Sequence, residues 1–177
     1  MIFKETNLEC AWIIEPELLT DNRGFFARTW CQREFEDRGL NSALVQCNIS
    51  FNAKSGTLRG MHYQIPPHGE TKLVRCTQGA IYDVIIDLRP QSPTFTQWVG
   101  IELTAKNHRM LYIPEGFAHG FQTLVEQTEV FYQMSEFYHP ESAIGVRWND
   151  PAFGIKWPTA NSVIISDKDS SYADFVG

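Results

Sequence analysis

The sequence predicts an all-β domain with the architecture of a sandwich, a barrel or a jelly roll and with a few short helices. Most segments are β-branched and aromatic or alternate between apolar and polar residues, which is typical of strands rather than helices. The 177 residues are 43% hydrophobic, which is enough for one ordinary core. The chain has no internal repeat and no Gly/Ser-rich linker, so we expect residues 1–177 to form a single domain.

Nine segments carry the strand pattern, and single Gly and Pro residues that suit turns separate them. They are residues 24–30, 44–51, 57–64, 72–77, 80–88, 95–104, 108–113, 117–124 and 129–138. The turn Thr77–Ala80 predicts an antiparallel hairpin between the fourth and fifth of these segments. Residues 31–39 are the one good helix candidate, ending at Gly39, which can adopt the left-handed cap. So many short strands in one domain favour an antiparallel architecture that encloses a small interior cavity.

The chain carries 15 Lys and Arg against 21 Asp and Glu, a net charge of -6. Such a surface repels a long phosphate backbone, so nucleic-acid binding is not expected, although a few Arg and Lys in one cleft still suit a small anion. The N-terminus does not have the pattern of a secretory signal, and no segment approaches the roughly 18 consecutive apolar residues of a membrane helix. We therefore expect a cytoplasmic protein without membrane contact.

The four cysteines, Cys10, Cys31, Cys47 and Cys76, are widely spaced and form no CxxC pair. A zinc cluster or a redox motif is therefore not expected, and buried, reduced thiols are the ordinary interpretation.

Strand alternation predicts which polar side chains point into the interior. Lys72 shares a face with Val74 and Cys76, so a lysine is expected to point inward. The same alternation puts Tyr132 and Tyr138 on one face of a later strand, where each can form part of a wall or serve as an acid.

The stretch Pro114–His119 reads PEGFAH, a Pro-x-Gly-x-x-His spacing that resembles the second half-motif of the cupin superfamily of jelly rolls. A metal cupin also carries His-x-His followed by Glu, whereas this chain reads His62-Tyr63-Gln64, with Glu70 farther on. One ligand of the usual three is missing, so no metal centre is expected. The resemblance implies a cupin-type jelly roll.

Six further blocks, in order along the chain, carry a more specific resemblance. They are DNRGFF at 21–26, QCNISFNAKSGTLRGMHYQ at 46–64, KLVRCTQGAIYDVIIDLR at 72–89, IPEGFAHGFQTL at 113–124, RWNDPAFGIKWP at 147–158 and SDKD at 166–169. Together they resemble the dTDP-4-dehydrorhamnose 3,5-epimerase family of deoxysugar enzymes. The resemblance implies an isomerase that inverts stereocentres beside the ketone of a nucleotide-linked 4-keto-6-deoxyhexose, without metal or redox cofactor.

Such a reaction needs a base for the proton next to the ketone, a group that stabilises the enolate, and an acid on the opposite face of the ring. The resemblance implies His62 as the base and Asp169 as the carboxylate that orients and stabilises its imidazole. It implies Lys72 as the cation beside the enolate and Tyr132 as the acid.

The resemblance also implies side chains that bind the substrate. They comprise two guanidinium groups for the diphosphate, two amides for the base or sugar, two rings for stacking, and one imidazole for the ketone or a sugar hydroxyl. In that order the residues are Arg23, Arg59, Gln46, Asn48, Phe26, Tyr138 and His119. A homodimer is implied, in which the N-terminal strand crosses to the partner and Arg23 and Phe26 serve the partner's site.

The chain departs from the family pattern at Arg28, where members acting on dTDP-sugars usually carry Glu. A donor in place of an acceptor suits cytosine, whose N3 accepts a hydrogen bond, better than thymine, whose N3–H donates one. A CDP-linked substrate is therefore an alternative, and contact of Arg28 with phosphate is another.

Three other functions stay open: an epimerase acting at C-3 alone, a sugar-nucleotide binding module without chemistry, and a ketoisomerase or metal-dependent cupin. His62→Asn separates an enzyme from a binding module, because only the enzyme loses turnover. A stoichiometric bound metal would favour the third function.

Overall fold

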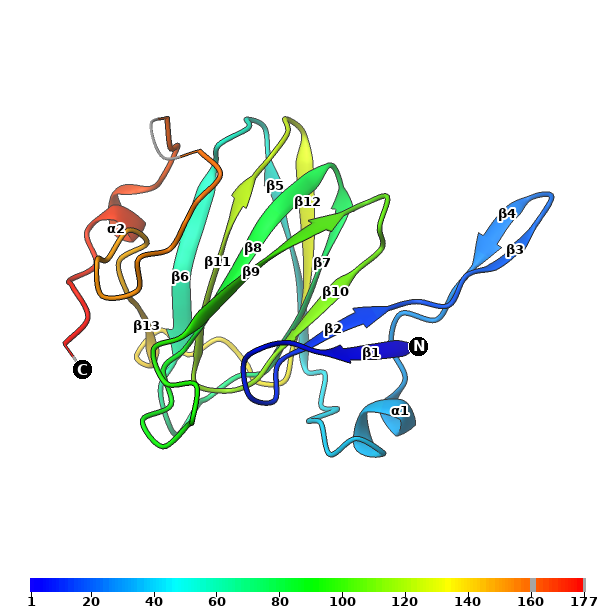
Figure 1. Cartoon of the computed structure of the whole chain (residues 1–177), viewed down its shortest axis with the longest axis horizontal. Coiled ribbons are helices and arrows are strands. Elements are labelled where there is room, and N and C mark those ends of the chain that lie inside the picture. The colour runs from blue at the N-terminus through cyan, green and yellow to red at the C-terminus, as the bar shows by residue number, and fades with distance from the viewer. Residues whose placement is uncertain (160–161, 177) are drawn as a thin grey trace.

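The structure is a computed structural model, and it describes residues 1–159 and 162–176. Two antiparallel sheets face each other, and a separate two-stranded hairpin extends away from them (Figure 1). The strands are β1 (Ile2–Glu5), β2 (Trp12–Glu15), β3 (Leu19–Asp21), β4 (Gly24–Phe26), β5 (Gln46–Asn52), β6 (Leu58–Gln64), β7 (Lys72–Gln78), β8 (Ala80–Asp87), β9 (Trp98–Thr104), β10 (Met110–Ile113), β11 (Phe117–Thr123), β12 (Thr128–Met134) and β13 (Ala143–Gly145). The helices are α1 (Gln32–Glu36) and α2 (Asp167–Ser170). The all-β prediction is confirmed.

The six-stranded sheet has the order β1-β2-β10-β7-β12-β5, and the five-stranded sheet has the order β13-β6-β11-β8-β9. Strands β7 and β8 are consecutive in the chain yet lie in different sheets, so the turn at Thr77–Ala80 links the two sheets. The predicted hairpin within one sheet is therefore wrong. Because each sheet buries an apolar face against the other, the two close into the jelly roll that the sequence predicts.

The main core lies between the sheets and follows the alternation of the strands. On β8, Ile81 and Ile85 are fully buried in this core, while Val84 and Ile86 belong to a second apolar cluster. The second cluster includes Phe153 and Trp157, so the C-terminal segment covers the outer face of the five-stranded sheet. A strand that is covered on both faces reads as a nearly continuous apolar run, as 80–88 does.

Several predicted elements differ in their ends from the observed ones. The helix at 31–39 is confirmed but shorter, and the segment 24–30 forms a strand only as far as Phe26. The segment 129–138 is a strand only to Met134, because the chain then turns and the Ser135 N–H donates to the Thr71 carbonyl at 3.0 Å. The sequence did not predict β1, β2, β3, β13 or α2, which are three to four residues long.

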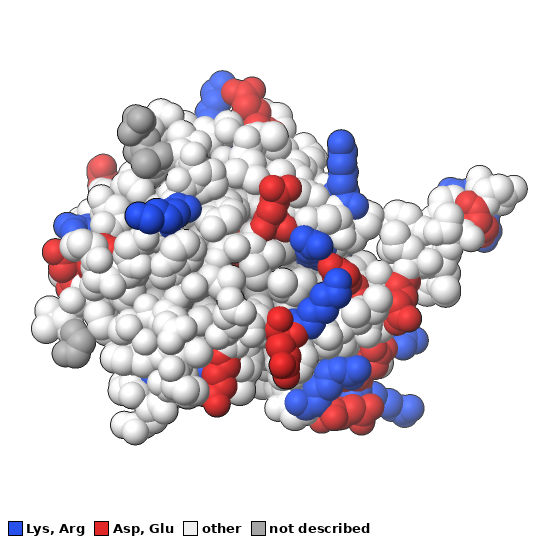
Figure 2. Space-filling view, in the orientation of Figure 1, with Lys and Arg blue, Asp and Glu red and all other residues white. Residues whose placement is uncertain are grey.

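The four cysteines are free thiols, but only Cys76 is buried, while Cys10 and Cys47 are exposed. The expectation that all would be buried is therefore wrong. Burial raises the pKa of the Cys76 thiol to about 11, so this group stays protonated at neutral pH. Among the described residues, no helix is long and apolar enough to cross a membrane. On the face in Figure 2, basic and acidic side chains are interspersed and form no basic patch.

Strands β3 and β4 form an arm that extends from the body beside the N-terminal strands (Figure 1). Its apolar side chains Leu19 and Phe26 are 68% and 72% exposed, which is unusual for residues of this type. Within its own chain the arm touches the body through Phe25, whose ring packs on that of His108 at 4.9 Å.

Candidate active site

A cavity of about 450 Å³ opens between the two sheets. Eight of the predicted site residues line it, and they come from both sheets and from the C-terminal segment. They are Asn48, Arg59, His62, Lys72, His119, Tyr132, Tyr138 and Asp169. The fold therefore brings together side chains that are more than a hundred positions apart in the sequence.

His62 on β6 and Asp169 on α2 form the central pair of the cavity. The His62 Nε2 and the Asp169 Oδ1 lie 2.8 Å apart, and Asp169 also accepts the Gly60 N–H at 3.1 Å. The imidazole is 42% exposed whereas the carboxylate is 8% exposed, so the imidazole faces the cavity and the carboxylate lies behind it. Because Nε2 is held by Asp169, Nδ1 is the ring nitrogen available to a bound molecule.

The local sequence SDKD explains how Asp169 reaches this place. Ser166 is the N-cap of α2, and its side chain accepts the Asp169 N–H at 3.1 Å. The cap begins a short helix that turns Asp169 toward β6. Burial alone would raise the pKa of Asp169, but the hydrogen bond and charge of His62, with the Gly60 N–H, outweigh it and hold this pKa below its usual value. Asp169 is therefore a carboxylate at neutral pH.

Tyr132 lies on β12 in the six-stranded sheet, opposite the sheet that carries His62. Its ring packs edge-on against His119 at a centroid distance of 6.2 Å and against Phe121 at 6.5 Å. Burial and the negative charge of Asp83 raise the pKa of Tyr132 far above its usual value. The phenol therefore remains protonated at neutral pH and can donate a proton.

Lys72 points inward as predicted, and it forms a buried ion pair that the sequence did not predict. The Lys72 Nζ lies 2.9 Å from the Glu70 Oε1, both side chains are 7% exposed, and the ammonium also donates to the His62 carbonyl at 3.3 Å. The other carboxylate oxygen of Glu70 has no hydrogen-bond partner among the described residues. Because neither charge is well solvated, each group fixes the position of the other.

His119 forms a second His–Asp pair, with Asp83. The His119 Nε2 and the Asp83 Oδ1 are 2.7 Å apart, and the side chains are 5% and 0% exposed. His119 on β11 lies directly opposite His62 on β6 in the strand register. Asp83 was missed, yet a signal was present: alternation places it on the same face of β8 as Ile81 and Ile85, and a charge there needs a buried partner.

The remaining lining residues surround this centre. The Arg59 Nε donates to the Asn52 Oδ1 at 2.8 Å, which steadies the guanidinium beside the cavity. Tyr138 lines the cavity although it follows the end of β12, and its N–H donates to the Gln46 Oε1 at 3.3 Å. Gln46 does not line the cavity, so in this chain its amide supports Tyr138. Ser166, Lys168 and Tyr172 also line it and were not predicted.

Besides Gln46, three further predicted binding residues lie outside the cavity of their own chain. The arm holds Arg23, whose side chain is 85% exposed and paired with Asp21, and Phe26. Arg28 follows the arm and pairs with Glu34 at 2.9 Å, with its side chain 62% exposed.

The fold and the site together define a cupin-type jelly roll in which an imidazole–carboxylate pair and a tyrosine line one cavity from opposite sheets. The chain belongs to the dTDP-4-dehydrorhamnose 3,5-epimerase family, whose model matches residues 5–176. It is 45% identical over 173 residues to the dTDP-4-dehydrorhamnose 3,5-epimerase of Methanothermobacter thermautotrophicus, covering 96% of this chain and 92% of that one.

Two solved structures illustrate the range of similar folds. A dTDP-4-dehydrorhamnose 3,5-epimerase from Bacillus anthracis, with TDP and PPi bound, is 47% identical with a TM-score of 0.93, covering 98% of this chain and 100% of that one. A 3'-monoepimerase from Streptomyces bikiniensis in complex with dTDP-quinovose is 32% identical with a TM-score of 0.88, covering 96% and 85%.

Proposed function

We propose that this protein inverts the stereocentres beside the ketone of a dTDP-linked 4-keto-6-deoxyhexose, at both C-3 and C-5. The observation that carries the proposal is the placement of His62, backed by Asp169, on one sheet and of Tyr132 on the other. Inversion requires that a proton leave one face of a carbon and arrive on the opposite face, so the base and the acid must lie on opposite sides of the ring. The names of the similar proteins support this substrate class.

In the proposed reaction, the His62 Nδ1 takes the proton from the carbon next to the ketone. The electron pair of that C–H bond forms the enolate, and its charge gathers on the ketone oxygen. The Asp169 carboxylate stabilises the imidazolium that results, because its lowered pKa keeps it ionised. General-base catalysis of this kind contributes about 10²- to 10⁴-fold to the rate.

Lys72 and His119 are the proposed stabilisers of the enolate oxygen. Both lie in the cavity, and each is held by a buried carboxylate, Glu70 and Asp83 respectively. Donors that are fixed in place before the reaction need no reorganisation when charge develops, which is the main source of electrostatic catalysis.

Tyr132 completes the reaction by donating its phenolic proton to the carbon from the opposite face. After one inversion His62 holds an extra proton and Tyr132 lacks one, so the site is reset by exchange with solvent. The proton that enters the product is thus derived from water. The net change is an isomerisation without oxidation or reduction, so the proposed steps use no metal or redox cofactor.

We also propose a homodimer in which the arm reaches the partner's cavity with Arg23 and Phe26. The support is that the arm projects from the body with an exposed Phe26, and that β5, an edge strand of the six-stranded sheet, exposes Ile49 (66%) and Phe51 (53%). Apolar side chains on an exposed edge strand need a cover. In this arrangement the partner's arm would join Arg59 and Asn48 around the nucleotide, with Tyr138 available for stacking.

The names of the similar proteins favour dTDP over CDP as the nucleotide. The CDP alternative, in which Arg28 reads the base, stays a prediction. Within its own chain the Arg28 side chain forms an ion pair with Glu34. Arg28→Glu, which reverses the charge of this side chain, tests the CDP alternative. An unchanged ratio of dTDP to CDP affinity would mean that Arg28 does not read the base. We retain two further proposals, a single domain over residues 1–177 and a cytoplasmic location.

The experiment that tests the function is incubation with the dTDP-linked 4-keto-6-deoxyhexose in heavy water, with the CDP-linked sugar in parallel, and location of the label by NMR. Deuterium at C-3 and C-5 is expected with wild type. Label at C-3 alone would indicate the 3-epimerase. Absence of label with both substrates would contradict the proposal, and if dTDP still binds it would favour the binding module.

A further inference from the structure

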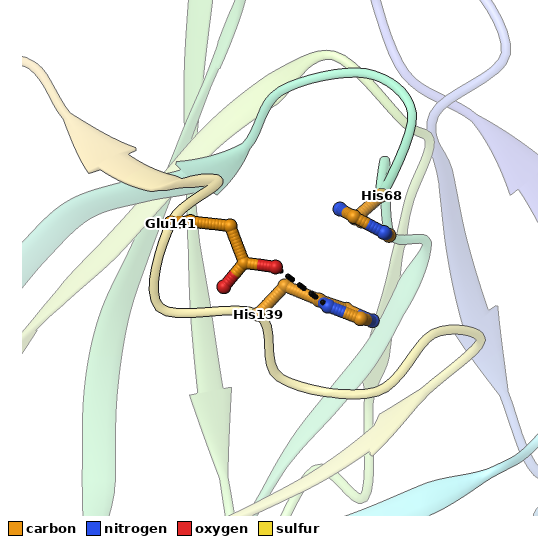
Figure 3. Close-up of side chains that lie close together, drawn as sticks. All are labelled: His68, His139 and Glu141. Carbon is orange, nitrogen blue, oxygen red and sulfur yellow. Dashed lines mark hydrogen bonds and ion pairs between the residues drawn. The ribbon is translucent and has the colours of Figure 1, made fainter.

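A second cluster of titratable side chains lies outside the catalytic centre, where the loop between β6 and β7 meets the segment between β12 and β13. Figure 3 shows its members, His68 from the first loop and His139 and Glu141 from the second. One nitrogen or oxygen atom from each of the three lies within 4.8 Å of those of the other two. None of the three takes part in the proposed proton transfer.

One buried residue holds the backbone of both histidines. The Gln64 amide nitrogen donates to the His68 carbonyl at 3.0 Å and to the Phe137 carbonyl at 3.1 Å, and its oxygen accepts the His139 N–H at 2.7 Å. Gln64 is 3% exposed. The two loops therefore arrive at the cluster already positioned, and the entropic cost of bringing their side chains to one ligand is small.

His68 is oriented in the way that a metal-binding imidazole is. The His68 Nδ1 lies 2.9 Å from the hydroxyl of Ser142, which is 5% exposed, so the Nε2 of His68 is left for a ligand. A hydrogen bond from the non-ligating nitrogen is the usual support of a metal-bound histidine. The His139 Nδ1 meets the Glu141 Oε1 at 3.2 Å, a longer contact that a competing ligand can replace.

The charge around the cluster also suits a cation. The His68 and His139 rings stack with centroids 3.5 Å apart and planes 8° apart, so the two imidazoles lie close enough to serve one ion. Two carboxylates lie beside them, since Glu141 is joined by Glu136, whose Oε1 is 3.9 Å from the His139 Nε2. Neutral imidazoles next to carboxylates are the donor set of zinc-class ions.

We propose that His68, His139 and Glu141 bind one divalent transition-metal ion of the zinc class, with water in the fourth position. A metal lies in the plane of each imidazole that binds it, so the stacked rings must separate. His139 is the ring that turns, because its contacts to Glu141 and Glu136, at 3.2 and 3.9 Å, are longer than the 2.9 Å contact between His68 and Ser142. The ion would tie two loops together next to Tyr138 without entering the reaction, so a metal bound by these residues would not favour the metal-dependent cupin function.

Titration of the metal-free full-length protein with zinc chloride, followed by calorimetry, tests the site. One ion per chain is expected, and it should be lost in His68→Asn and in His139→Asn. His108→Asn is the matched control, because this histidine lies against the arm and should leave the titration unchanged. Ser142→Ala should weaken binding roughly 10-fold, as the loss of a supporting hydrogen bond usually does.

Cobalt(II) gives a second readout, since its visible absorption reports tetrahedral coordination by protein ligands. The same variants should lose this spectrum while keeping the thermal stability and turnover of the metal-free wild type, which shows that they are folded. Absence of binding by wild type would overturn the proposal. Wild-type affinity in either His68→Asn or His139→Asn would also overturn it, since the ion would then be held elsewhere.

Discussion

The cavity and the N-terminal arm differ in how much of their function one chain can provide. The four proposed catalytic side chains all line the cavity, where His62 and Asp169 pair with each other and Lys72 pairs with Glu70. On the arm, Arg23 and Phe26 are exposed and reach no cavity of their own chain. Chemistry that needs fixed geometry is thus built inside one jelly roll, whereas the arm would serve a site only in the proposed dimer.

This difference has a physical cause. A buried charge must be paired, so burial of Asp169 and Lys72 forces their partners into place and preorganises the centre. An exposed guanidinium paired with Asp21 on a projecting hairpin gains little from its ion pair, so it can exchange this partner for a phosphate at small cost.

The largest expected effect is that of His62→Asn, which removes the base but keeps a polar side chain at this position. We expect turnover to fall by about 10⁴-fold while dTDP affinity is preserved, since base catalysis contributes up to that factor. Steady-state kinetics and a binding titration measure the two. His68→Asn, at a histidine that is not among the residues lining the cavity, should have full activity, and near-normal turnover of His62→Asn would remove His62 from the mechanism.

Tyr132→Phe tests the proposed acid, which lies on the sheet opposite the one that carries His62. Formation of the inverted product should fall by about 10²- to 10³-fold, because the acid on the far face is gone. His62 should still remove and return protons on its own face, so deuterium exchange into the substrate without inversion is expected by NMR. If inversion and exchange fell together by the same factor, Tyr132 would have no separate role as the acid.

Arg23→Ala tests the arm. We expect KM to rise roughly 10-fold with little change in kcat, because a charge-assisted contact to the diphosphate is lost while the reacting centre is intact. Arg33→Ala on α1 is the matched control, since Arg33 is also an exposed arginine but does not lie on the arm. A fall in kcat without a change in KM would mean that the arm acts on the chemistry rather than on binding.

Ser166→Ala tests whether the N-cap of α2 preorganises the cavity by orienting Asp169. Loss of the N-cap of α2 should lower the free energy of unfolding by about 1 kcal/mol. It should also reduce kcat, because Asp169 is oriented by this cap. Urea denaturation and kinetics measure the two effects. Full kcat in a destabilised variant would show that Asp169 reaches His62 without the cap.

The smallest effect is the pH dependence that Asp169 gives to stability. Its pKa is lower in the folded than in the unfolded chain, so its contribution is present above the unfolded value and is lost as the pH falls through the folded value. Urea denaturation from about pH 5 downward should therefore show a steeper loss of stability in wild type than in Asp169→Asn. Parallel curves for the two proteins would contradict the lowered pKa.

The sequence was sufficient for the fold class and for most of the cavity, for reasons that particular residues make clear. Alternation alone placed Lys72 inward, and the same rule would have revealed Asp83 between Ile81 and Ile85. Asp169 followed only from family resemblance, because a carboxylate in SDKD otherwise looks like a solvated loop residue.

The rest depended on contacts between distant segments, which local patterns do not encode. The pairing of Glu70 with Lys72 requires that a loop carboxylate fold back beside the start of β7. The short strands β1 and β2 mix charges into their sequence because they lie at one side of the six-stranded sheet, where the Lys4 Nζ bonds the Glu15 Oε2 at 2.6 Å across the pair.

The most direct test of the difference between the cavity and the arm uses dimers that combine two impaired variants. One subunit carries His62→Asn, and the other carries both Arg23→Ala and Phe26→Ala. Under the proposed arm exchange, the intact cavity of one subunit would receive the intact arm of the other. The two variants are dissociated, mixed in equal amounts and allowed to reassociate. Half of the dimers should then be mixed, and each mixed dimer has one complete site of its two, so roughly one quarter of wild-type activity is expected at limiting substrate. Formation of mixed dimers without any recovery would contradict the account.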